Sequence, residues 1–196
     1  AIIKYWGKYG VQLPRNPSLS LTLAASCTDT MLEYSLKEDS GNGQIDLEFF
    51  FHQEENDAFQ SKIQAYLNSL LPIYPFLKQL KLTIRSGNSF PHSAGIASSA
   101  SGMSALALCL CSLEDLLFGT LKDPAAFDQK ASYLARLGSG SACRSIFPYA
   151  SIWGESTLVK GSSNEFAVAA ESYLHESFKD FHDDILIVSR EEKAVS

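Results

Sequence analysis

Residues 90–102 read Phe-Pro-His-Ser-Ala-Gly-Ile-Ala-Ser-Ser-Ala-Ser-Gly, and this run of small side chains decides how the rest of the chain is interpreted. It follows a strand-like run at 80–84 and precedes a helical pattern over 98–117. The centre of that pattern, 103–111, is apolar on every side, which is typical of a helix enclosed in a core. The sequence therefore predicts a strand, a small-residue loop and a buried helix in succession.

A loop of this composition suits a phosphate chain. Backbone N–H groups reach phosphate oxygens only where side chains are small, and a following helix directs its positive end at the charge. The stretch matches neither the Walker loop nor the dinucleotide-binding loop. The alternative interpretation is a Ser-rich helix cap packed under a sheet. The hydroxyls of two serines could bind phosphate or a phosphate-bound Mg²⁺. The candidate ATP-binding residues are Ser93, Ala94, Gly95, Ala97, Ser98, Ser99 and Ala100.

Hydrophobic periodicity on either side predicts a mixture of strands and helices. Asn56 is the expected cap of a helix that runs to about residue 71, and Asp123-Pro124 opens another through 137. The Asn42-Gly43 step suggests a hairpin between the strands before and after it. This order favours an α+β fold with helices packed on one face of a mixed sheet. Strands are predicted at 18–25, 30–36, 45–51, 80–84, 150–153, 166–169 and 184–189.

Composition limits the classes of function. With 196 residues and 45% hydrophobic side chains, the chain can bury a full core as one domain, or as two small ones. A net charge of −6 argues against a nucleic-acid surface. The absence of an uninterrupted apolar run of about 18 residues argues against a membrane span, and we expect a cytoplasmic protein with buried free thiols. Because there is no initial Met and both ends look like strands, we expect the chain to continue at both ends.

Residues 3–8 read Ile-Lys-Tyr-Trp-Gly-Lys and form a second motif. Lys4 and Lys8 supply two cations, and Tyr5 supplies a hydroxyl, around a bend that Gly7 permits. Such a group could hold a polyanion, although lysines near a terminus are more often simply solvated. Residues 16–20, Asn-Pro-Ser-Leu-Ser, follow shortly afterwards.

The third motif, residues 135–144, reads Ala-Arg-Leu-Gly-Ser-Gly-Ser-Ala-Cys-Arg. Ser139, Gly140 and Ser141 would expose N–H groups and hydroxyls, and Arg144 would provide a two-pronged fork for a carboxylate or a phosphate. The alternative is a flexible Gly/Ser loop.

Together these motifs resemble one branch of the superfamily of galactokinase, homoserine kinase, mevalonate kinase and phosphomevalonate kinase (GHMP). The loop at 90–102 resembles the phosphate loop of those kinases, with Ala97 where most of them carry a second glycine. The Gly-Ser-Gly-Ser-Ala-Cys-Arg run and the opening Lys-Tyr-Trp-Gly-Lys match the diphosphomevalonate decarboxylase family. The resemblance covers essentially the whole chain, although residues 153–181 match only loosely.

The resemblance implies that residues 1–196 form a GHMP-type ATP-binding N-terminal domain. Members use ATP and Mg²⁺ to phosphorylate the tertiary hydroxyl of (R)-5-diphosphomevalonate, then lose phosphate and CO2 to give isopentenyl diphosphate. Carried over by motif, Arg144 would hold the carboxylate, and Lys4 would lie near the transferred phosphoryl group. The family's catalytic aspartate belongs to a C-terminal half and has no counterpart here, and a homodimer is expected. The substrate diphosphate would be held by Tyr5, Lys8, Ser139, Gly140 and Ser141.

Three other readings stay open. A phosphomevalonate decarboxylase or a mevalonate 3-kinase would use the same ATP loop, and a non-catalytic protein could bind a phosphorylated metabolite on this fold. A metal site built from His175, His182, Asp183 and Asp184 is a further candidate, although that acidic stretch is more simply a solvated surface.

Overall fold

The computed structural model describes residues 1–38, 43–90, 98–178 and 182–183. The chain divides into two compact units, one formed by Ala1–Cys27 and Asn88–Ser196 and the other by Thr28–Gly87. The sequence favoured one domain and left two small ones as the alternative.

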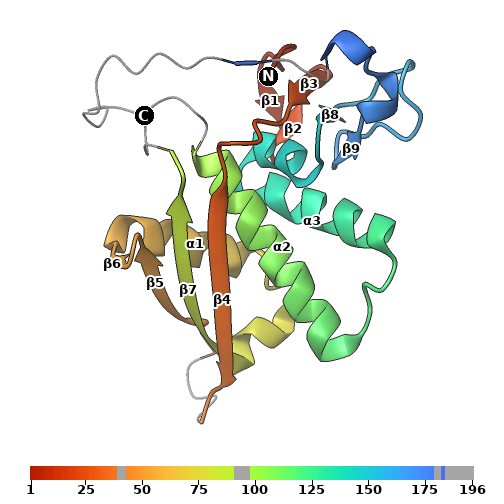
Figure 1. The fold of residues 1–196 in the computed structure, drawn as a ribbon. Coiled ribbons are helices and arrows are strands. Elements are labelled where there is room, and N and C mark those ends of the chain that lie inside the picture. Colours follow the sequence, from red (N-terminus) through yellow and green to blue (C-terminus); the bar gives the residue numbers. More distant parts are fainter. Residues whose placement is uncertain (39–42, 91–97, 179–181, 184–196) are drawn as a thin grey trace. The chain divides into compact units, whose positions relative to one another are not determined.

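The unit Thr28–Gly87 is built on a four-stranded sheet (Figure 1). Its strands are β4 (Thr28–Leu36), β5 (Asp46–Phe51), β6 (Glu54–Glu55) and β7 (Leu80–Asn88), in the order β4-β7-β5-β6. β5 pairs with β7 in parallel and with β6 antiparallel. Thr30 contacts Ser86, while the backbone N–H of Lys37 donates to Gln79, so β4 and β7 run antiparallel. The predicted mixed sheet is confirmed.

The predicted hairpin between β4 and β5 is wrong, because β7 lies between these two strands. The side chains of Leu82 and Ile84 in β7 are almost fully buried, and an apolar strand of this kind is stabilised most in the middle of a sheet. The tight turn of this unit instead joins β5 to β6 at His52 and Gln53, whose φ angles of 50° and 69° are left-handed. A turn without glycine or asparagine gave no signal in the sequence.

Helix α1 (Asp57–Ser69) connects the parallel strands β5 and β7 and packs against β5. Asn56 caps it as predicted, since its side chain accepts a hydrogen bond from the backbone N–H of Phe59 at 3.0 Å. The ring of Phe59 meets Phe51 edge-on, with centroids 5.1 Å apart. A 3-10 turn, η1 (Pro75–Gln79), leads into β7.

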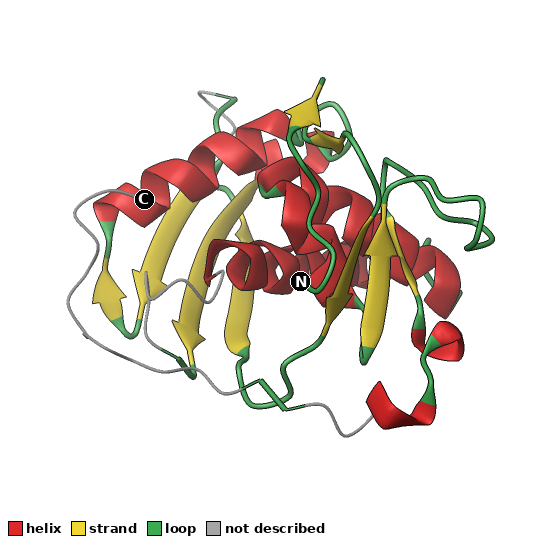
Figure 2. Ribbon diagram, turned by 90° about the horizontal axis from the view of Figure 1, so that it is seen from above, coloured by secondary structure: helices red, strands yellow, loops and turns green. Residues whose placement is uncertain are grey.

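The other unit contains two small antiparallel sheets (Figure 2). The first pairs β1 (Lys8–Tyr9) with β2 (Leu13–Pro14). The second has the order β3-β8-β9, formed by β3 (Ser18–Leu21), β8 (Ala150–Trp153) and β9 (Ala167–Ala169). β3 is shorter than the predicted 18–25, and the strand predicted at 184–189 lies outside the described residues.

Two long helices form the core of this unit. Helix α2 (Ser98–Phe118) packs against α3 (Pro124–Gly138), and both pack against the 3-10 helix η2 (Gly140–Ile146) (Figure 1). No residue of α2 from position 100 to 111 is exposed, so the predicted enclosed helix is confirmed. By length and composition α2 could span a membrane, but a core helix meets the same criteria. Asp123 caps α3 as predicted, accepting from the Ala126 N–H at 2.9 Å. The short turns η3 (Glu171–Tyr173) and η4 (Glu176–Phe178) follow.

The thiols are free among the described residues, but not all are buried. Cys111 and Cys143 are buried, whereas Cys27 is exposed. Cys27 lies between β3 and β4, outside any helix or strand, and is the last residue of the segment Ala1–Cys27. The expectation of a buried thiol is therefore wrong for this position.

Candidate functional site

The N-terminal motif is held in place by one asparagine. The Asn16 side chain accepts from the backbone N–H of Trp6 at 2.7 Å and donates to the carbonyl of Lys4 at 3.1 Å. Gly7 provides the bend at φ 89°, and its carbonyl accepts from the Arg15 N–H at 3.2 Å. Asn16 thus closes the segment into a loop that fixes the backbone on both sides of Tyr5.

Tyr5 is the point at which the first and third motifs meet. Its half-buried ring packs edge-on against the fully buried Trp153, with centroids 5.1 Å apart. Two cations lie over the same ring, with the Lys8 Nζ atom 5.9 Å and the Arg144 Cζ atom 5.8 Å from its centroid. The fold therefore places Lys8 and Arg144 over the same ring, although Arg144 is more than 130 residues away from Tyr5 and Lys8 in sequence.

Arg144 is a buried cation with unused hydrogen-bond donors. The residue is only 9% exposed, and its Nε and Nη1 atoms are buried without a hydrogen-bond partner in the part of the chain that the structure describes. Burial lowers the pKa of Arg144 from its usual value, since desolvation disfavours the charged form. Because a guanidinium stays charged in proteins, this arrangement favours an anionic ligand with two acceptor oxygens.

Gly140 lies where no larger residue fits. A Cβ atom at this position would come within 2.9 Å of the Trp153 ring and 3.1 Å of the Gln12 Oε1 atom. The same Gln12 oxygen accepts from the Lys8 Nζ atom at 2.5 Å. Gln12 therefore joins Lys8 to the start of η2, and Gly140 permits that close approach.

The alternative of a flexible Gly/Ser loop is wrong, because this stretch forms an ordered 3-10 helix, η2. Gly138 is the last helical residue of α3, and Ser139 is the cap between the two helices. Cys143, Ala142 and Gly140 are fully buried or nearly so, while Ser139 and Ser141 are half-buried. Serines of α2, α3 and β8 donate hydrogen bonds to η2 carbonyls, which explains why this glycine-containing stretch is ordered.

Of the ATP-binding candidates, Ser93, Ala94, Gly95 and Ala97 lie outside the described residues. Ser98, Ser99 and Ala100 form the first turn of α2, where Ser98 is half-buried and Ser99 is exposed. One turn further on, Ser104 donates to the Ala142 carbonyl at 2.7 Å. The start of α2 is therefore tied to the helix that carries Arg144. Backbone N–H groups in the first turn of a helix have no carbonyl partner within the helix and lie at its positive end, so this turn could bind an anion.

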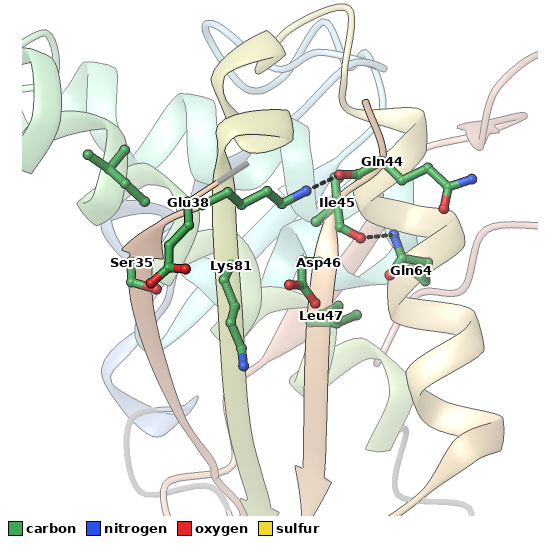
Figure 3. A pocket seen from close by; sticks show the side chains of 10 residues that line it. Ser35, Glu38, Gln44, Ile45, Asp46, Leu47, Gln64 and Lys81 are labelled. Atoms are coloured by element: carbon green, nitrogen blue, oxygen red, sulfur yellow. Dashed lines mark hydrogen bonds between the residues drawn. The ribbon is translucent and has the colours of Figure 1, made fainter. Parts of the chain in front are cut away.

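A separate cavity of about 830 Å³ lies in the unit Thr28–Gly87 (Figure 3). It opens between the end of β4 and the start of β5, and Asp46, Gln64 and Lys81 are among its lining residues. The side chain of Gln64 donates to the Ile45 carbonyl at 3.3 Å, and that of Lys37 donates to the Gln44 carbonyl. None of the motif residues lines this cavity, so it does not belong to the candidate site.

The acidic stretch gives no support to a metal site. No group of three or more His, Cys, Asp or Glu side chains that could hold a metal occurs among the described residues. His175 is exposed and its Nδ1 atom contacts the Ser177 hydroxyl at 2.9 Å, and Asp184 is not described.

Several residues that shape the site gave no clear signal in the sequence. Gln12, Ser104, Ser132 and Ser151 are single polar residues that belong to none of the three motifs, and their hydrogen bonds form only in the folded chain. In the sequence, Arg136 was marked only by its place in the third motif, with no role of its own. It is 2% exposed, forms an ion pair with Glu165 at 2.5 Å and donates to the Val11 carbonyl, which anchors the loop carrying Gln12.

Comparison with known proteins agrees with these features. Residues 1–165 match the family described as "Diphosphomevalonate decarboxylase-like N-terminal domain". The chain belongs to this family.

Named relatives support the same family. The chain is 34% identical to the diphosphomevalonate decarboxylase of Candida albicans over 201 residues, covering 98% of this chain and 52% of the relative. A solved structure of the mevalonate diphosphate decarboxylase from Enterococcus faecalis is 35% identical, with a TM-score of 0.64, and covers 88% of this chain and 49% of that one. A structure described as MDDEF in complex with MVAPP, AMPPCP and magnesium is 34% identical, with a TM-score of 0.65 over 88% of this chain and 48% of that one.

The chain spans about half the length of the curated relatives that it matches. The family model and the solved structures therefore establish both the family and the GHMP-type α+β fold for this chain.

Proposed function

We propose that the full-length protein is a diphosphomevalonate decarboxylase. The observation that carries this proposal is the buried guanidinium of Arg144, which lies over the Tyr5 ring as Lys8 does and has two nitrogen atoms without a partner among the residues that the structure describes. Its proposed substrate is (R)-5-diphosphomevalonate, and ATP with Mg²⁺ supplies the phosphoryl group. A related structure described with MVAPP, AMPPCP and magnesium supports this choice of ligands.

The proposed residue roles are those that the resemblance implies, and charge and position support them. Arg144 would bind the substrate carboxylate, because its fork matches two oxygens and its burial strengthens the interaction. Tyr5 and Lys8, with the half-buried Ser139 and Ser141 around Gly140, would bind the diphosphate. Lys4, which is exposed, would lie near the transferred phosphoryl group and offset its charge.

Ser98 and Ser99 would bind ATP phosphates together with the preceding small-residue loop. Their place in the first turn of the 21-residue helix α2 supports this role, since the helix directs its positive end at an anion.

The chemistry explains why two anion sites are needed. A tertiary hydroxyl is a poor leaving group and its phosphate ester is a good one. As the phosphate departs, positive charge develops on carbon, and the neighbouring carboxylate loses CO2 and supplies the electron pair of the new double bond. The residues of this chain would orient the carboxylate and fix the position of the diphosphate, so that they would contribute to catalysis by positioning and electrostatics.

The substrate class is tested by comparing ADP formation from three substrates with the full-length protein. We expect kcat/KM to be highest with diphosphomevalonate and to fall by about 100-fold or more with 5-phosphomevalonate or mevalonate, because one or two charged contacts are lost. A preference for the monophosphate or for mevalonate would favour a related enzyme. Binding of diphosphomevalonate without ADP formation would favour a non-catalytic binding protein.

A further inference from the structure

Three buried serine hydroxyls donate hydrogen bonds to three consecutive carbonyls of η2. Ser104 Oγ lies 2.7 Å from the Ala142 oxygen. Ser132 Oγ lies 2.9 Å from the Cys143 oxygen, and Ser151 Oγ lies 2.9 Å from that of Arg144. The serines come from α2, α3 and β8, and each is 3% exposed or less.

The geometry of η2 explains why three different elements supply these donors. A 3-10 helix has about three residues per turn, so successive carbonyl groups are placed about 120° apart around its axis, each directed mainly along the axis and tilted slightly outward. Three consecutive carbonyls therefore lie on three sides of the helix, and each accepts from a different neighbouring element. Buried carbonyls need partners, and serine is the smallest side chain with a hydroxyl donor.

This arrangement fixes the backbone on which Arg144 stands. The guanidinium contacts the Tyr5 ring, while its Nε and Nη1 atoms have no partner among the described residues. Its direction is consequently set by the backbone at 144 and by the packing of that ring. The hydroxyl of Ser151 is bonded to the carbonyl of Arg144 itself.

We propose that Ser151, supported by Ser104 and Ser132, is a positioning residue that aims the Arg144 guanidinium at the anionic group of the substrate. The proposal rests on the function proposed above. It assigns no contact with substrate to Ser151, which is 1% exposed and acts through Arg144.

The three serines differ in the further hydrogen bonds that they form. Ser132 also accepts from the Ala167 N–H at 2.9 Å, so its loss also weakens the attachment of β9. Ser104 can alternatively donate to the Ala100 carbonyl, one turn back in its own helix, at 2.7 Å. A substitution of Ser151 therefore tests the positioning of Arg144 with less effect on stability than a substitution of Ser132.

The test is a double-mutant cycle in the full-length protein. Ser151→Ala should lower kcat/KM for diphosphomevalonate by about ten-fold, the value of about one hydrogen bond, while the KM for ATP stays within about two-fold. In an Arg144→Gln background the same change should have little further effect, since a residue that acts through Arg144 has nothing left to position. Ser112→Ala, an exposed serine of α2, is the matched control and should behave like the wild type.

Two outcomes would overturn the proposal while the wild type remains active. One is Ser151→Ala kinetics equal to those of Ser112→Ala. The other is an equal loss in both backgrounds, which would mean that Ser151 acts independently of Arg144. A wild type that neither binds nor converts diphosphomevalonate would instead overturn the proposed function, and the inference with it.

If Ser151→Ala does not fold, Ser104→Ala provides the same test. Alanine is the best helix former, so this variant of α2 should fold. We expect a fall in kcat/KM of about three-fold that disappears in the Arg144→Gln background. Unchanged kinetics of the folded Ser104→Ala protein would contradict the proposal.

Discussion

At the scale of single residues, Arg144 is maintained at a cost in stability. The buried Nε and Nη1 atoms of its guanidinium have no hydrogen-bond partner among the described residues, which is unfavourable, and apolar replacements of buried ions are often neutral or stabilising. Arg144→Met should therefore raise the free energy of unfolding by about 1 kcal/mol in the absence of ligands, while kcat falls by about 100-fold or more. Denaturant unfolding and steady-state kinetics measure the two effects. A destabilised Arg144→Met protein would show that the guanidinium is already satisfied.

Gly140 allows a second test at this scale. Gly140→Ala would place a Cβ atom 2.9 Å from the Trp153 ring and 3.1 Å from Gln12, so we expect destabilisation by about 1–3 kcal/mol and weaker substrate binding. Gly102→Ala is the control, because a Cβ there meets nothing within 4 Å and alanine favours the helix. Its melting temperature should be equal to or above that of the wild type. Equal melting temperatures for the two variants would contradict the close approach at Gly140.

The thiols provide a prediction about pH. Burial raises the pKa of Cys143 to about 12 from 9.0, because the charged thiolate is disfavoured. The folded state binds the thiol proton more tightly than the unfolded state does. The resulting contribution of Cys143 to the free energy of unfolding is complete below pH 9 and is lost as the pH rises towards 12. At pH 8 a thiol reagent should modify the exposed Cys27 quickly and Cys143 only on unfolding. Peptide mapping identifies the modified residue, and rapid labelling of Cys143 in folded protein would contradict its burial.

At the scale of elements, two asparagines have separable roles. Asn16 holds the loop that carries Tyr5, whereas Asn56 only caps α1. Asn16→Ala should raise the KM for diphosphomevalonate by about ten-fold, since the loop must be ordered by the substrate itself. Asn56→Ala should lower the free energy of unfolding by about 1 kcal/mol and leave the KM unchanged. Equal KM values in the two variants would remove the role assigned to Asn16.

The elements show how far sequence patterns determine this fold. The limits of α2 and the caps of α1 and α3 were predicted closely, because capping and helical periodicity are local properties. The pairing of β4 with β7, and not with β5, depends on which strand is buried most deeply in the finished sheet. The order within η2 likewise depends on hydroxyls from three other elements, which a local pattern of Gly and Ser does not reveal.

At the scale of the whole molecule, the candidate site joins segments from distant parts of the sequence. Motifs predicted Tyr5, Lys8, Gly140 and Arg144 as site residues. In the fold Lys8 and Arg144 lie over the Tyr5 ring, and both Tyr5 and Gly140 lie close to Trp153. The motifs did not identify Gln12 or the three buried serines, whose roles exist only in the folded chain. The ATP loop before Ser98, the homodimer and the cytoplasmic location remain predictions.

The central claim is that this chain contributes the substrate site of an enzyme that couples phosphorylation to decarboxylation. The most direct measurement follows ADP and CO2 together when the full-length protein is incubated with ATP, Mg²⁺ and (R)-5-diphosphomevalonate. We predict that one CO2 is released for each ADP formed, and that both fall together in Arg144→Ala while ATP binding persists. ADP formation without CO2 would contradict the claim and indicate a kinase of the same superfamily.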